Sequence, residues 1–63
     1  MHPATEELLN YFEYTHLPEH LQKISKPFCT LANQMADELD GPELTAGLRK
    51  LLEAKDCMVR AAI

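Results

Sequence analysis

The chain of 63 residues contains no tryptophan, two glycines and two cysteines, and only 6% of it is aromatic. No uninterrupted run reaches the roughly 18 apolar residues of a membrane-spanning helix, and no basic-then-apolar leader is present. The cysteines, Cys29 and Cys57, match neither a zinc spacing nor a secreted disulfide framework. We therefore expect a cytoplasmic protein with reduced, buried cysteines, and a Cys29–Cys57 disulfide is the alternative.

Positive charge is also scarce. The chain has six Lys and Arg residues and ten Asp and Glu residues, which gives a formal net charge of −4. A molecule with this field repels nucleic acids and anionic membranes. The sequence therefore predicts no DNA, RNA or membrane partner, and any anionic ligand has to be bound by local positive groups.

The length limits the chain to one domain, residues 1–63. Below about 70 to 80 residues a single core supplies only about 3–5 kcal/mol unless disulfides, metals or oligomerisation add to it. The composition, 46% hydrophobic and 25% charged, is that of a folded globular protein. The sequence therefore predicts a folded chain that is stabilised by association with other copies.

Prolines mark where the helices begin. Pro3 suits the first turn of a helix, since its missing N–H would be unpaired there, and we expect this helix to run from about Pro3 to about Glu13. The stretch "YTHLPEH" interrupts the apolar pattern. Pro18 is well placed to begin the next helix.

The second predicted helix carries its apolar residues in steps of three and four, which is the spacing of one helix face. These residues are Leu17, Leu21, Ile24, Phe28, Leu31, Met35 and Leu39. Pro27 lies inside this pattern, where a proline removes one hydrogen bond and costs about 3 kcal/mol. We expect a continuous, proline-kinked helix of about 22 residues, with a break into two helices as the alternative.

The sequence "LDGPEL" predicts a tight turn, with Gly41 in the left-handed conformation that closes a helix and Pro42 starting the next one. Leucines at helical spacing then indicate a third helix of about 20 residues. Gly47 within it suggests a close backbone approach, and a tolerated surface glycine is the alternative. The predicted fold is all-α: a short N-terminal helix and an antiparallel helical hairpin, whose exposed apolar surface favours a symmetric homo-oligomer.

Catalytic and metal-binding patterns are weak. The chain has no glycine-rich phosphate loop and no credible order of nucleophile, base and acid, so we expect no enzyme and no cofactor. His16 and His20 are four residues apart and would need one shared helix to hold a metal. Pro18 between them argues against that helix, so we expect no metal site.

Two residues suit a nucleotide. Tyr11 offers a flat face, and stacking of a base on an aromatic ring contributes roughly 1–3 kcal/mol. Lys26 supplies a point charge for a phosphate, beside the backbone that Pro27 opens. From the residues alone, the alternatives to nucleotide binding remain open: Tyr11 is an aromatic used for packing, and Lys26 is a solvated lysine.

Three stretches carry a resemblance that spans nearly the whole chain in order: "HPATEELLNYFEYTHLPEHLQ", "SKPF" and "DGPELTAGLRKLLEAKDCMVRAA". They are very similar to the phage anti-CBASS cyclic-nucleotide sponge family, in particular to its members from Pseudomonas phages. The hairpin domain of that family is shared with the phage anti-Thoeris sponge.

The resemblance implies an interlocked homohexamer of helical hairpins in the cytoplasm of the infected bacterial host. It implies binding of cyclic dinucleotides and cyclic trinucleotides, such as cyclic GMP-AMP and cyclic tri-adenylate. Such a protein sequesters these immune signals without cleaving them and so blocks activation of the CBASS effector.

Matching positions in the family make Tyr11 the base-stacking residue and Lys26 the phosphate contact of a dinucleotide pocket between protomers. Arg60 is the candidate phosphate ligand of a separate trinucleotide pocket, and an arginine that complements the helix dipole is the alternative. A sponge for cyclic ADP-ribose signals of Thoeris and a plain helical protein-interaction module remain as alternative functions.

Overall fold

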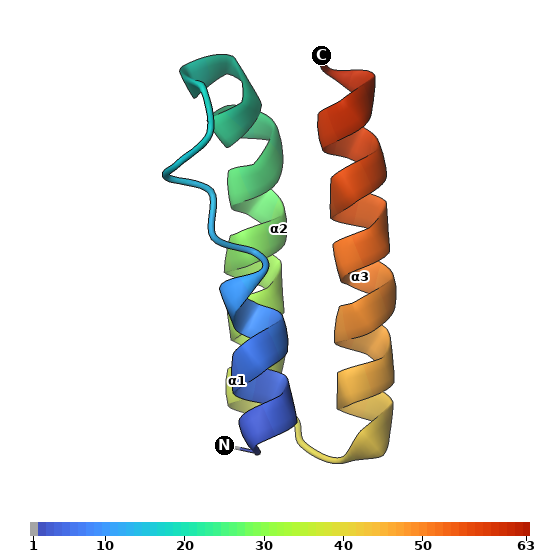
Figure 1. Ribbon diagram of the computed structural model, residues 1–63. Helices are drawn as coiled ribbons and strands as arrows, with labels where there is room; N and C mark the ends of the chain where they lie inside the picture. Colours follow the sequence, from blue (N-terminus) through green and yellow to red (C-terminus); the bar gives the residue numbers. More distant parts are fainter. Residues whose placement is uncertain (1) are drawn as a thin grey trace.

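The structure is a computed structural model that describes residues 2–63. Within this range it contains three helices and no strand: α1 (Pro3–Asn10), α2 (Glu19–Glu38) and α3 (Pro42–Ala61). Figure 1 shows α2 and α3 running antiparallel, with α1 beside the hairpin and starting at its turn end. The all-α prediction is confirmed, and the homohexamer stays a prediction.

Helix α1 starts where its proline predicts and ends earlier than expected. The Nδ1 atom of His2 accepts a hydrogen bond from the Ala4 N–H at 3.0 Å and so caps the first turn. At the other end the N–H groups of residues 11, 12 and 13 each bond the carbonyl three residues back, at 3.1, 3.1 and 3.2 Å. This tighter turn ends α1 at Asn10, three residues before the predicted Glu13, because the backbone no longer follows the α-helical register.

Helix α2 begins directly after Pro18, which occupies the N-cap position, and continues through Pro27 to Glu38. The prediction of one continuous helix is therefore confirmed, and the alternative of a break at Pro27 is wrong. Because proline has no N–H, the carbonyl of Lys23 loses its usual partner four residues on. The bend at Pro27 stays a prediction.

The buried face of α2 agrees with the predicted one only in part. Its buried residues are Leu21, Ser25, Ala32 and Ala36, whereas Leu31 is 42% and Leu39 is 56% exposed. The most deeply buried residues of this face are therefore Leu21 and three small side chains. Phe28 and Met35 are half-buried and pack against the core beside them, whereas Leu31 and Leu39 remain partly in solvent.

The turn and α3 agree with the prediction in most respects. Gly41 has a positive φ of 96°, which residues with a side chain rarely adopt, and its ψ of 177° makes it an extended N-cap of α3 rather than a left-handed closing residue of α2. Gly47 is exposed, and no atom lies within 4 Å of the position that a Cβ would occupy. Within one chain Gly47 is thus a surface glycine and makes no close approach.

The core joins all three helices. Its buried members are Leu8, Phe12, Ala32, Leu44 and Leu48. Both cysteines are free; Cys29 is half-buried and packs against this core, and Cys57 is exposed, which corrects the expectation that both are buried. In the described residues no helix combines the length and the apolar character needed to cross a membrane.

Candidate functional site

Tyr11 follows the last residue of α1, and its backbone is fixed on both sides. Its N–H donates to the Leu8 carbonyl at 3.1 Å. Its neighbour Phe12 is 0% exposed in the core, whereas Tyr11 itself is 55% exposed. An aromatic side chain is thus presented to solvent from a backbone anchored in the core.

The connector of residues 11–18 continues from Tyr11, and the Glu13 carboxylate organises it. Glu13 Oε1 accepts hydrogen bonds from the backbone N–H groups of Tyr14 and Thr15, both at 3.0 Å, and from the Thr15 hydroxyl at 2.8 Å. The bonds from Thr15, first from its N–H and then from its hydroxyl, and the bond from the Tyr14 N–H lower the pKa of Glu13 below its ordinary value.

Gln22, in the first turns of α2, holds the other half of the connector. Its side-chain Nε2 donates to the Leu17 carbonyl at 2.8 Å and to the Thr15 carbonyl at 3.3 Å. The Leu17 N–H in turn donates to the Tyr14 carbonyl at 3.0 Å. Residues 13–17 are therefore held from both ends.

Lys26 is exposed on α2 and lines a shallow groove of about 480 Å³. The groove is formed by Lys23, Lys26, Pro27, Thr30, Leu31 and Gln34. Two ammonium groups at a spacing of three residues thus lie on one side of α2, beside the helix turn that Pro27 weakens. The sequence prediction named Lys26 and missed Lys23, although the i, i+3 spacing places both on one helix face.

All residues of this groove belong to α2, and Tyr11 does not line it. The structure of one chain therefore does not unite the two predicted dinucleotide residues in a single groove. Each is exposed on the surface of the single chain.

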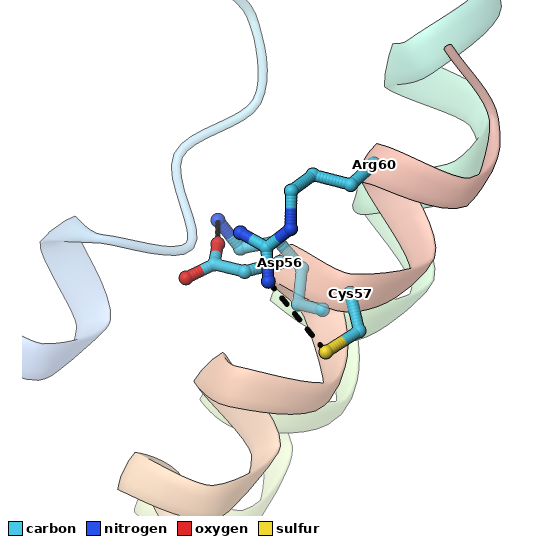
Figure 2. A network of polar contacts seen from close by, with 4 residues as sticks. Asp56, Cys57 and Arg60 are labelled. Atoms are coloured by element: carbon cyan, nitrogen blue, oxygen red, sulfur yellow. Dashed lines mark hydrogen bonds and ion pairs between the residues drawn. The ribbon is translucent and has the colours of Figure 1, made fainter.

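Arg60 lies in the last turn of α3, apart from the Lys26 groove. One guanidinium nitrogen lies 3.6 Å from the Sγ atom of the exposed Cys57 (Figure 2). One turn earlier, Lys55 Nζ pairs with the Asp56 carboxylate at 2.9 Å. This position suits both the predicted phosphate contact and the alternative, in which Arg60 complements the negative end of the helix dipole.

A larger hollow of about 660 Å³ lies at the turn end of the hairpin. It is lined by the start of α1, the end of α2 and the start of α3, and includes Asp37 and Asp40. Two carboxylates disfavour a phosphate there, so the hollow is a poor site for a nucleotide.

The two candidate metal-binding histidines lie on different elements, His16 in the connector and His20 in α2. Among residues 2–63, no cluster of three His, Cys, Asp or Glu side chains is arranged to hold a metal ion.

Comparisons of the chain with protein-family models, with curated proteins and with solved structures found no match.

Proposed function

We propose that this chain is a phage anti-defence protein that binds and sequesters cyclic di- and trinucleotide immune signals without cleaving them, in the cytoplasm of the infected bacterium. Sequestration requires affinity and no catalytic groups, which suits a site built from an aromatic ring and lysines. It rests on the family resemblance, with the roles of the matching family positions applied to this chain.

The observation that carries the proposal is the exposed ring of Tyr11 on an anchored backbone. The neighbouring Phe12 is fully buried, so an exposed fraction of 55% for Tyr11 is not explained by packing within the chain. A nucleobase stacked on such a ring gains roughly 1–3 kcal/mol. A rigid ring also loses little entropy on binding.

The net charge of −4 repels an anionic ligand, and Lys26 supplies a local positive charge that attracts it. Lys23 lines the same groove and adds a second ammonium group. Because Tyr11 is outside this groove, we propose that the dinucleotide pocket is completed between protomers, with Tyr11 of one chain facing Lys26 of another.

Large apolar side chains left in solvent support the proposed homohexamer. Leu31, Leu39, Met58 and Ile63 are 42%, 56%, 53% and 86% exposed in the single chain. Covering such residues provides the association energy that a chain of this size needs. Arg60, near Met58 and Ile63 in sequence, is proposed as the phosphate ligand of a separate trinucleotide pocket between subunits.

The first experiment is calorimetric titration of the purified protein with 3′,3′-cyclic GMP-AMP and, separately, with cyclic tri-adenylate. The protein is then digested with protease and the released nucleotide is identified by chromatography. Binding with intact nucleotide recovered is the expected result.

Recovery of cleaved nucleotide would make the protein a phosphodiesterase and overturn the proposal. Binding of cyclic ADP-ribose derivatives alone would favour a sponge against Thoeris. If the protein binds neither cyclic GMP-AMP, nor cyclic tri-adenylate, nor cyclic ADP-ribose derivatives, a helical protein-interaction module would be favoured.

A further inference from the structure

The connector between α1 and α2 has unusually complete hydrogen bonding for an exposed loop. Connecting segments are generally the mobile parts of small proteins. Here the backbone of residues 11–13 bonds back to α1, Glu13 Oε1 accepts three hydrogen bonds, and Gln22 donates to two carbonyls. The connector is therefore pre-formed in the free chain.

We infer that Glu13 and Gln22 are positioning residues for the Tyr11 ring, an inference that rests on the proposed function. Neither side chain is needed as a ligand contact in this role. Glu13 fixes the turn that directly follows Tyr11 and Phe12, and Gln22 ties the far part of that turn to α2. Together they hold residues 13–17, which continue from Phe12 beside the exposed ring, in one arrangement before a nucleotide arrives.

The reason that this should matter for affinity is entropic. A flexible connector would have to be ordered when a base stacks on Tyr11, and that ordering would oppose binding. A connector held in advance avoids this cost, as in other pre-organised sites. Loss of either clamp should thus weaken binding although no ligand contact is removed.

Because Phe12 is anchored in the core, loss of the Glu13 or Gln22 hydrogen bonds should loosen the connector without loosening the helices. Phe12 is 0% exposed and belongs to the core, so loosening residues 13–17 should leave the helices packed. The inference therefore predicts a split: ligand affinity and connector order fall, while thermal stability and the oligomeric state stay nearly constant.

Two substitutions test it. Gln22→Met keeps the length of the side chain and removes its donor, and Glu13→Ala removes the acceptor. Glu7→Ala is the matched control, because Glu7 is an exposed acid on α1 and its loss changes the net charge by the same amount as Glu13→Ala.

The measurements are the dissociation constant for 3′,3′-cyclic GMP-AMP and the ¹⁵N relaxation of the amides of residues 11–17 in the free protein. We expect both test variants to bind about tenfold more weakly and to show increased motion in the connector. Glu7→Ala should match the parent protein in both measurements. Gln22→Glu should behave like Gln22→Met, because a carboxylate cannot donate to the Thr15 and Leu17 carbonyls.

Unchanged affinity in variants whose connector has become mobile would overturn the positioning role, and so would a connector that stays rigid in both variants. If the parent protein binds no cyclic nucleotide, the proposed function fails and the positioning role fails with it. The relaxation data distinguish these cases, since they test the pre-formed connector without any ligand.

Discussion

Tyr11 and Phe12 are adjacent in the chain and have opposite environments: the first side chain is 55% exposed and the second is 0% exposed. The tight turn at the end of α1 separates them, because it directs Phe12 into the core and leaves Tyr11 outside. The proposed binding residue and a core residue thus lie at neighbouring positions.

Tyr11→Ala should abolish most dinucleotide binding, with a loss of roughly 1–3 kcal/mol from the missing stack. Tyr11→Phe keeps the aromatic face and should retain most of the affinity. Calorimetry gives the affinities, and light scattering after size-exclusion chromatography gives the oligomeric state, which both variants should keep. Phe12→Ala should unfold the chain, since such core truncations cost about 3–5 kcal/mol. Dissociation of Tyr11→Ala into monomers would show that Tyr11 is structural.

Pro27→Ala should stabilise α2 and weaken ligand binding. Alanine restores the N–H that can bond the Lys23 carbonyl and removes a penalty of up to about 3 kcal/mol. The same change closes the backbone next to Lys26, so affinity should fall as the melting temperature rises. Thermal unfolding and calorimetry on one sample measure both effects.

Asn33→Ala serves as the control for this prediction, because it adds a strong helix former to α2 outside the Lys26 groove. Unchanged affinity in Pro27→Ala would contradict a role for the proline in the site.

Protonation of Glu13 should release the connector at acid pH. A carboxyl group whose pKa is lowered by hydrogen bonds in the folded state stabilises that state fully above its unfolded pKa, about 4.3 for glutamate. The bonds from Thr15 and Tyr14 lower the pKa of Glu13, so this contribution is lost only as the pH falls through the lower, folded pKa. An NMR titration of the Glu13 carboxyl group and the Tyr14 and Thr15 amides should report a midpoint below the ordinary glutamate value. A midpoint at or above that value would contradict the clamp, and Glu13→Gln should show no such transition.

Ser25→Ala should raise the stability of the protein. The Ser25 hydroxyl is buried, with 0% of the residue exposed, and it has no hydrogen-bond partner among residues 2–63. An unpaired buried polar group costs about 1–3 kcal/mol, and alanine removes it with little change in volume. Chemical denaturation measures the gain. A loss of stability would contradict this and would reveal a partner for Ser25 in the assembled protein.

Leu39→Glu should disrupt the proposed homo-oligomer. This side chain is 56% exposed in one chain, and a carboxylate at an apolar contact between copies is costly to bury. We expect smaller particles in light scattering and a concentration-dependent melting temperature. Lys50→Gln makes the same change in net charge on an exposed residue of α3 and should leave the particle size unchanged. An intact oligomer of Leu39→Glu would place the interface elsewhere.

Much of the fold could be predicted because the signals are local. Pro3, Pro18 and Pro42 each lie at a helix start, and Gly41 has the positive φ that the turn requires. The buried face of α2 could be predicted from periodicity only in part. Apolar spacing identified Leu21, but it missed the buried Ser25, Ala32 and Ala36, since small residues carry little apolar signal although they allow helices to approach closely.

The candidate site could likewise be predicted from the sequence only in part. Tyr11 and Lys26 were identified by their chemistry and by the family resemblance. Glu13 and Gln22 were missed, because their partners are backbone groups of an irregular connector that no periodicity describes. The local sequence "EYT" held a weak signal, since an acid two residues before a threonine can close such a turn.

Helix α1 runs parallel to α3 (Figure 1), and Leu8 of α1 and the following Phe12 share the core with residues about half the chain away, among them Leu44 and Leu48. A helix of eight residues is too short to be stable alone. The hairpin of α2 and α3, whose contacts are closer in sequence, should therefore fold first, and α1 should dock last. Docking of α1 then brings Tyr11 to its place, so the proposed ligand-binding surface should form only when the rest of the chain has folded.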